Sequence, residues 1–298
     1  MPPSSPPPRP TGGLALALGA FGIWGLMPLY LRLVHQVPPL EFVGWRIIWT
    51  LPFCLLIVAL TRHGAELRAV LASGKTVRRL ALSALLVGIN WTIYVLSIQA
   101  GHFFAASLGY YINPLANVLA GTLFLGERLS PRQWLAVTLA ALGVSLLAWG
   151  ALDMLGISLS LAISFCAYGL VRKITPVSSL AGLTVESALL LIPAVAIAAW
   201  YGFSPAGSSF GVTVGSSLLI ACAGIITAVP LMMFAAAAQR MDYSTLGMAQ
   251  FLAPTMVFIT GLTLFHEPLR PVQLACFVLI WLSIALFTWD LLARRSAA

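Results

Sequence analysis

The stretch that decides the fold is residues 113–149, NPLANVLAGTLFLGERLSPRQWLAVTLAALGVSLLAW, which align without a gap to residues 253–289, APTMVFITGLTLFHEPLRPVQLACFVLIWLSIALFTW. Ten of the 37 aligned positions are identical, and they include Pro114/Pro254, Gly121/Gly261, Glu127/Glu267, Pro131/Pro271, Gln133/Gln273 and Trp149/Trp289. Leucines align by chance in an apolar chain, but a proline, a glycine and a glutamate at one offset do not. The chain is therefore predicted to contain an internal duplication, whose period is far longer than that of solenoid repeats.

The composition is that of an integral membrane protein. The 298 residues include only 16 Lys+Arg and 8 Asp+Glu, 60% are hydrophobic, and the mean hydropathy is +0.98. Long apolar blocks without period-two alternation exclude a membrane β-barrel. Because a helix needs about 20 mostly apolar residues to cross a bilayer, ten transmembrane helices are predicted, at residues 14–33, 40–60, 80–100, 105–125, 132–150, 154–172, 181–201, 216–238, 244–265 and 271–290.

The basic residues indicate how these helices are oriented. With the N-terminus in the cytoplasm, the cytoplasmic segments hold 13 Lys and Arg residues, whereas the outer loops hold only Arg32 and Arg270. This bias follows the positive-inside rule, so both termini are predicted to be cytoplasmic. The proline-rich residues 1–13 are expected to form a disordered cytoplasmic tail without a cleaved signal peptide, and residues 291–298 a second cytoplasmic tail.

The two copies are predicted to have opposite orientations, because each contains five helices. The first five-helix repeat is assigned to residues 14–150 and the second to residues 151–290, with a weaker match between FGIWGL at 21–26 and FCAYGL at 165–170. The expected fold is an all-α integral membrane protein with ten transmembrane helices in two inverted five-helix repeats. Inverted repeats are common in secondary transporters, in which the halves enclose a substrate path. The alternative is a duplication that now serves only stability.

Other classes of chemistry have little support in the sequence. The four cysteines are scattered without CxxC spacing, so neither a disulfide framework nor a zinc site is expected. The four histidines are isolated and lie near predicted membrane boundaries, and no nucleotide-binding motif is evident. We therefore expect no enzymatic activity, no metal, no cofactor and no nucleic-acid partner.

Several segments resemble a known family. SLGYYINPL (107–115), FLGERLSPRQWLAV (124–137), FCAYGLVRK (165–173), ITAVPLMMFAAAAQR (226–240) and LFHEPL (264–269) are similar to the RarD branch of the EamA-type transporters, in the drug/metabolite transporter superfamily. The resemblance covers nearly the whole chain after residue 13. It implies ten helices in two inverted repeats, a bacterial inner membrane, and a central cavity lined mainly by helices 1, 3, 4, 6, 8 and 9. RarD-like proteins also carry a label that links them to chloramphenicol sensitivity.

Two charges lie well inside predicted helices, Arg46 in helix 2 and Glu186 in helix 7. A charge at a helix centre costs about 2.5–3.5 kcal/mol to insert, so it usually faces a cavity or a partner. Inversion places Arg46 toward the outer side and Glu186 toward the inner side, so no direct pair is expected. Arg46 is a candidate anion-attracting residue and Glu186 a candidate proton-coupling residue; the alternatives are interfacial anchoring and interhelical hydrogen bonding.

A set of polar and aromatic residues is the candidate substrate cavity. Such groups would not be favoured by lipid, and rings with a few amides can hold an amphipathic small molecule. The alternative is that the amides join neighbouring helices and that some rings lie in the interfacial belt. The set is Asn90, Trp91, Tyr94, Tyr110, Tyr111, Asn113, Asn117 and Gln250.

Paired prolines and helix-start signals complete the sequence pattern. Pro114 and Pro254 occupy matching positions inside helices 4 and 9, where each can kink its helix and act as a hinge; packing alone is the alternative. Ser130 and Gln133 form an expected capping box at the start of helix 5. Glu127 and Glu267 are interpreted as structural residues near these helix starts.

The predicted function is a secondary transporter that moves a small organic solute, such as a metabolite, an amino-acid-like compound or a drug, by alternating access and in the export direction. The alternative class is a membrane enzyme or a nontransporting receptor that uses the same helical cavity. The expected partners are the solute, the lipid bilayer and protons as a coupling ion.

Overall fold

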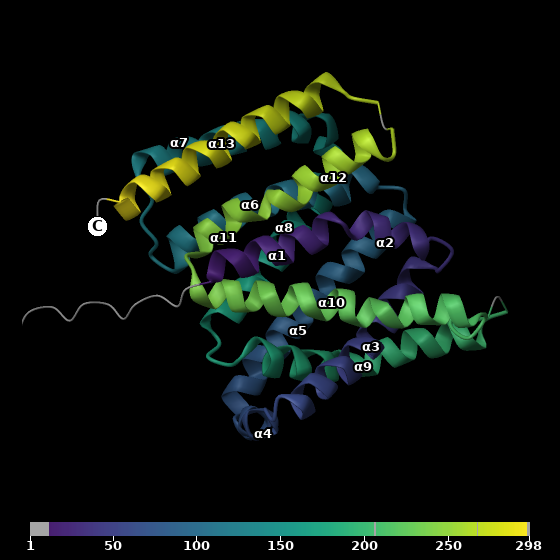
Figure 1. The fold of residues 1–298 in the computed structure, drawn as a ribbon. Coiled ribbons are helices and arrows are strands. Elements are labelled where there is room, and N and C mark those ends of the chain that lie inside the picture. The colour runs from purple at the N-terminus through teal and green to yellow at the C-terminus, as the bar shows by residue number, and fades with distance from the viewer. Residues whose placement is uncertain (1–11, 206, 267, 297–298) are drawn as a thin grey trace, which may run out of the picture.

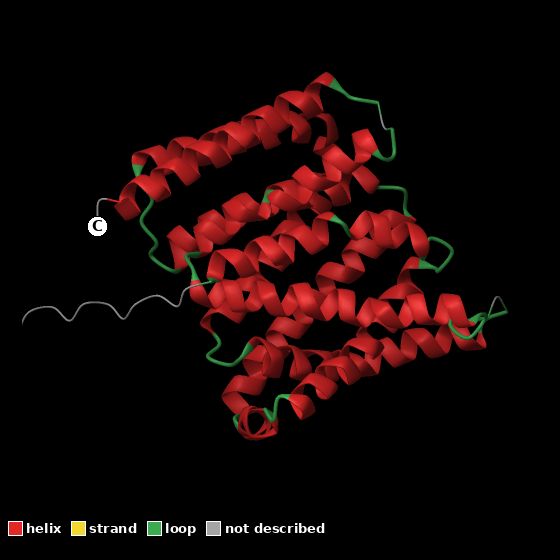
Figure 2. Cartoon of the chain, in the orientation of Figure 1, coloured by secondary structure: helices red, strands yellow, loops and turns green. Residues whose placement is uncertain are grey.

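The structure, a computed structural model, describes residues 12–205, 207–266 and 268–296. Within these residues all regular secondary structure is helical (Figure 2), as predicted. The elements are α1 (Gly13–Gly25), α2 (Met27–Leu33), α3 (Pro39–Leu60), α4 (Gly64–Ala72), α5 (Gly74–Gln99), α6 (Phe103–Phe124), α7 (Pro131–Ala148), the 3-10 helix η1 (Trp149–Met154), α8 (Leu155–Ile174), α9 (Ser179–Phe203), α10 (Val214–Arg240), α11 (Tyr243–Gln250), α12 (Leu252–Thr263) and α13 (Pro271–Ser296). Residues 1–11 of the expected tail, and Glu267, lie outside the described residues.

Nine segments of the described chain are long and apolar enough to cross a membrane, and they correspond to nine of the predicted spans. The remaining predicted span, 105–125, is α6, a helix of 22 residues. Two amides in the middle of α6, Asn113 and Asn117, lower its hydropathy. The chain therefore has the all-α fold of a multi-pass membrane protein.

The long helices run back and forth between two ends of the bundle (Figure 1). At one end α1 begins, α13 finishes and the short helix α4 lies; we call this the α4 end. The other end holds the last turn of α2 and the connecting residues 34–38, 100–102 and 207–213; we call it the α2 end. Helix α4 itself was not predicted, because nine residues are too few to give a transmembrane signal.

Local sequence signals explain where several helices begin. Ser130 caps α7: its side chain accepts a hydrogen bond from the Gln133 backbone N–H, and the Gln133 side-chain oxygen accepts one from the Ser130 backbone N–H, so the predicted capping box is confirmed. Thr213 and Ser216 form a second box at the start of α10. These bonds satisfy backbone N–H groups that no helical carbonyl reaches.

The two matched prolines lie in different local structures. Helix α6 continues through Pro114 without a break. In contrast, the ninth predicted span is divided, with α11 ending at Gln250 and α12 beginning at Leu252, just before Pro254. A proline removes one backbone hydrogen bond and its ring crowds the preceding turn, which accounts for a break on that side.

Packing in the bundle depends on close backbone approaches. A Cβ at Gly224 in α10 would lie 2.5 Å from the Trp49 carbonyl carbon in α3, so only glycine permits this crossing. At the centre, Phe234 of α10 packs against Phe21, Phe165 and Tyr168, with ring centroids 5.2–6.2 Å apart. Large apolar side chains such as Ile192 and Leu123 are exposed on the outside of the bundle, where lipid would surround them.

Candidate functional site

A buried ion pair joins α8 and α9 near the α4 end. Arg172 Nη1 lies 3.4 Å from Glu186 Oε1, and the exposed fractions of the two side chains are 0% and 2%. The helix directions explain the meeting, because side chains lean toward the N-terminus of their own helix. Arg172 on α8 therefore leans away from the α4 end, and Glu186 on the antiparallel α9 leans back toward it.

A glycine makes room for this arginine. A Cβ added to Gly182, one turn before Glu186 on α9, would lie 1.7 Å from Arg172 Nη1 and 2.5 Å from Arg172 Cζ. The guanidinium therefore lies directly on the glycine backbone. Any larger residue at this position would push the arginine away from the carboxylate.

The pair is only partly satisfied by other groups. The Ser83 hydroxyl on α5 donates a hydrogen bond to Glu186 Oε1, and Arg172 Nη2 donates to the Ser179 carbonyl at 3.3 Å. Among the described residues, Glu186 Oε2 and Arg172 Nε have no hydrogen-bond partner although both are enclosed. A buried charged group that is incompletely bonded is costly to maintain, which marks it as a candidate functional site.

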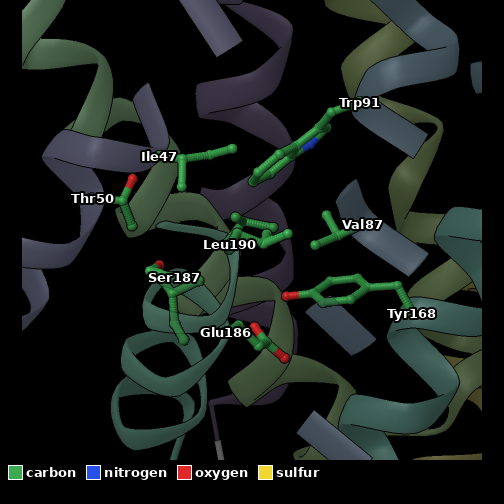
Figure 3. A pocket seen from close by; sticks show the side chains of 10 residues that line it. Ile47, Thr50, Val87, Trp91, Tyr168, Glu186, Ser187 and Leu190 are labelled. Atoms are coloured by element: carbon green, nitrogen blue, oxygen red, sulfur yellow. The ribbon is translucent and has the colours of Figure 1, made fainter. Parts of the chain in front are cut away.

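A small cavity adjoins the carboxylate. It has room for about one water molecule. Figure 3 shows Trp91 at one side, Glu186 at the other and the Tyr168 hydroxyl pointing between them. The lining comes from α3, α5, α8, α9 and α10, and consists of Ile47, Thr50, Val87, Trp91, Tyr168, Leu183, Glu186, Ser187, Leu190 and Leu231.

Arg46 contacts Trp91, which also lines this cavity. Its guanidinium carbon is 3.9 Å from the centroid of the Trp91 ring, a cation–π contact between α3 and α5. The rings of Tyr94 and Tyr110 meet edge to face nearby, with centroids 5.8 Å apart. Arg46 and Glu186 do not pair, in keeping with the sequence expectation.

The predicted amides form an interhelical cluster. Asn117 Nδ2 on α6 donates to Gln250 Oε1 on α11 at 2.7 Å, and Gln250 Nε2 donates to Asn113 Oδ1 at 2.6 Å. Asn113 Nδ2 donates to the Ala162 carbonyl of α8 at 2.7 Å. Asn90 on α5 likewise donates to α8, at the Leu161 carbonyl and Ser164 Oγ. In this conformation these amides join neighbouring helices, which the sequence analysis gave as the alternative to lining a substrate cavity.

The remaining predicted residues are more dispersed. Of the eight candidate cavity residues, Trp91 alone lines the cavity beside Glu186. The Tyr111 ring packs edge to face on Phe277 of α13, with centroids 5.6 Å apart. Tyr110 is 48% exposed. The predicted set thus falls into an aromatic group around Arg46 and an amide group between α6, α8 and α11.

Sequence reasoning missed Arg172, Ser83 and Tyr168. Arg172 was counted among the cytoplasmic basic residues, whereas it is completely buried. The available signal was the short connection at 175–178, which keeps the last turn of α8 close to the start of α9, so that a long side chain on one can reach the other. Ser83 lies 103 positions before Glu186, and no local pattern links them.

Side-chain bonds to backbone also join helices at the α4 end. Glu127, after α6, accepts hydrogen bonds from the Tyr243 and Ser244 backbone N–H groups at 2.6 and 2.8 Å, so it caps α11. Lys173 Nζ donates to the Ala238 and Met241 carbonyls at 2.8 and 2.7 Å. Glu127 is therefore structural, as interpreted, but it serves a helix of the second half.

The fold and this polar interior are those of a multi-pass membrane transporter, and comparisons with known proteins give the family. Residues 11–149 match the EamA-like transporter family. The chain is 41% identical over 278 residues to an uncharacterized transporter of Pseudomonas aeruginosa, covering 93% of each chain. It is 40% identical to Protein RarD of Salmonella typhi over 93% of this chain and 95% of that protein, and 39% identical to Protein RarD of Escherichia coli over 93% and 94%.

The chain therefore belongs to the EamA-like transporter family, in its RarD-like branch. A solved crystal structure with 20% sequence identity matches with a TM-score of 0.73, covering 96% of this chain and 100% of the other. At that identity the likeness concerns the fold alone.

Proposed function

We propose that this protein is a secondary transporter that moves a small organic solute across the bacterial inner membrane by alternating access, in the export direction. The observation that carries the proposal is the Arg172–Glu186 pair, enclosed among transmembrane helices beside a cavity. Ionisable residues within membrane bundles are expensive and are retained mainly along substrate or ion paths. Membership of a transporter family agrees with this use of the pair.

The packing of the helices supports two inverted five-helix repeats, in residues 14–150 and 151–290. Three helices pack against their own counterparts in the other half, α3 on α9, α6 on α11 and α7 on α13. In the other half, α5 corresponds to α10 and α8 corresponds to α1. The contact between α5 and α8 accordingly has a counterpart in the contact between α10 and α1. A pseudo-two-fold relation requires this pattern, and such halves can exchange conformations to alternate access.

Glu186 is the proposed proton-coupling residue. Its carboxylate touches both the Arg172 guanidinium and the cavity, so a proton arriving through the cavity would neutralise it and weaken the ion pair. Weakening the pair would loosen α9 from α8 and α5 at the α4 end. The charge change would thereby favour the conformation that is open at that end.

Flux in liposomes that contain only this protein tests the proposal. Purified protein should exchange an external solute with a preloaded one from a panel of metabolites and drugs, and protein-free liposomes should not. A membrane enzyme would instead convert the solute chemically, which mass spectrometry of the lumen would reveal. Absence of flux across the whole panel, with folded protein, would contradict the transporter function.

Cysteine labelling tests the proposed orientation. The four native cysteines are replaced by alanine, and single cysteines are introduced at two exposed positions, Ala65 at the α4 end and Ala100 at the α2 end. An impermeant thiol reagent should label Ala100→Cys in intact cells and Ala65→Cys only after the membrane is opened. The reverse pattern would place the termini outside.

A further inference from the structure

Arg46 is a cation in the interior of the bundle without an anionic partner in the described chain. It lies seven residues after the start of α3, which is roughly 10 Å from the α2 end at 1.5 Å per residue. No carboxylate of the described residues lies within 4.0 Å of its guanidinium, and its buried Nε has no hydrogen-bond partner. Membrane arginines normally pair with an anion or a carbonyl.

The surroundings of Arg46 are aromatic. The Trp91 ring faces the guanidinium, and Tyr94 and Tyr110 lie nearby. Arg46, Trp91 and Tyr94 are half-buried, and the Tyr110 ring is 48% exposed. One turn further along α3, the buried Trp49 indole N–H also lacks an acceptor. The region supplies donors, tyrosine hydroxyls and ring faces but, among the described residues, no carboxylate for the arginine.

We propose that Arg46 binds the carboxylate of a small organic anion, whose apolar part packs on Trp91, Tyr94 and Tyr110. This inference rests on the proposed function and names the solute class, an amphipathic monoanion. A planar guanidinium can bind a carboxylate through two parallel hydrogen bonds, and tyrosine and tryptophan rings provide the apolar contact. The competing role is structural, with Arg46 serving only to fix the Trp91 ring.

Three probes of similar shape separate charge from ring contact: phenylacetate, phenylacetamide and phenethylamine. Each is titrated into the purified protein in nanodiscs, and its affinity is obtained from the concentration dependence of the melting temperature. Phenylacetate should bind about tenfold or more tightly than the uncharged amide, because hydrogen bonds between charged groups are the stronger ones. Phenethylamine should not stabilise the protein.

Variants assign the effect to Arg46. Arg46→Gln should weaken phenylacetate binding about tenfold or more while leaving phenylacetamide unchanged, and Arg46→Lys should retain part of the preference. Arg32→Gln is the matched control, since Arg32 also lies over a ring, that of Phe265 at 5.4 Å, but is exposed. It should bind phenylacetate like the wild type.

Equal affinities for phenylacetate and phenylacetamide in the wild type, or an unchanged phenylacetate affinity in Arg46→Gln, would overturn the site. If Arg46→Gln does not fold, the affinities of the three probes for the wild type and for Arg46→Lys still test whether Arg46 binds a carboxylate. Liposome flux separates this inference from the transporter function. Flux without any preference for carboxylates removes the anion site only, whereas Arg46-dependent binding without flux removes transport only.

Discussion

Two arginines, Arg172 and Arg46, lie inside the bundle in opposite electrostatic situations. Arg172, toward the α4 end, meets the Glu186 carboxylate and has no exposed surface. Arg46, toward the α2 end, meets a tryptophan ring and no carboxylate of the described residues. Trp91 contacts Arg46 and also lines the cavity beside Glu186. One end of the interior therefore supplies its own counterion, and the other leaves a cation unpaired.

This difference fits a transporter whose two ends have different roles. A pair held within the protein joins helices at one end, whereas an unpaired cation at the other end is available to an anion. The bonds of Glu127 and Lys173 to backbone groups reinforce the α4 end in the same way. If the two arginines respond alike to substitution, their different pairing has no energetic meaning.

The largest expected effect is on stability. Arg172→Met should lower the free energy of unfolding by about 3–5 kcal/mol, because it leaves Glu186 buried without its counterion. Arg46→Met removes a cation–π contact worth about 0.5–2 kcal/mol and also removes the cost of an unpaired charge, so it should lower the free energy of unfolding by less than about 2 kcal/mol. Both values are measured by denaturant titration in mixed micelles. Equal losses would contradict the contrast between a paired and an unpaired arginine.

A double variant sharpens this result. In Arg172→Met/Glu186→Leu neither charge is present, and most of the lost stability should return, since apolar residues of similar volume can replace a buried ion pair. Proton-driven transport should be absent in the double variant, because the titrating carboxylate is gone. Recovery of stability without recovery of transport would assign the pair to function rather than to folding.

The next effect concerns the dependence of transport on protons. Glu186→Gln keeps the shape of the side chain and removes its titration. Wild-type liposomes should accumulate solute faster when their lumen is acidic, because an exchanging proton leaves as the solute enters. The variant should lose this pH-driven accumulation and retain exchange of solute down its own gradient. An unaltered response to the pH gradient would remove Glu186 from the coupling step.

The sequence predicted the membrane fold because its signals are long and redundant. Apolar blocks of about 20 residues locate helices regardless of their partners, and the Ser130–Gln133 pattern located a helix start correctly. Breaks were harder to predict. Pro114 and Pro254 match in the two copies, yet only the second lies beside an interruption, because tertiary packing decides whether a proline kink is absorbed.

The interior polar contacts were less predictable. The depth of a residue in the membrane follows from counting residues along its helix. Arg46 and Glu186 were therefore correctly expected not to pair. Depth does not reveal where a long side chain reaches, and Arg172 extends from a helix end into the bundle. Whether an amide lines a cavity or joins two helices also depends on which helix faces it. The bond between Asn117 and Gln250, which are 133 positions apart, illustrates this dependence.

A smaller effect should come from the glycine beneath the ion pair. Gly182→Ala places a methyl group where the Arg172 guanidinium lies, and overpacking of this kind costs about 1–3 kcal/mol. Gly156→Ala on α8 is the control, because an added Cβ there meets nothing within 4 Å, and alanine is the better helix former. Melting temperatures in detergent give the comparison. A fully stable Gly182→Ala protein would mean that Arg172 can leave Glu186 freely.

The amide cluster between the two ends should respond least. Asn117→Ala removes the bonds to Gln250 Oε1 and Asn113 Oδ1, and interhelical bonds in membranes contribute about 0.6 kcal/mol on average and at most about 1.7 kcal/mol. Thr122→Val on the same helix is the control, since the Thr122 hydroxyl bonds only carbonyls of α6 itself. If the cluster merely joins helices, Asn117→Ala should lower the melting temperature slightly and leave solute affinity unchanged. A loss of affinity without a loss of stability would instead return these amides to the solute path and extend the binding region from the α2 end into the centre of the bundle.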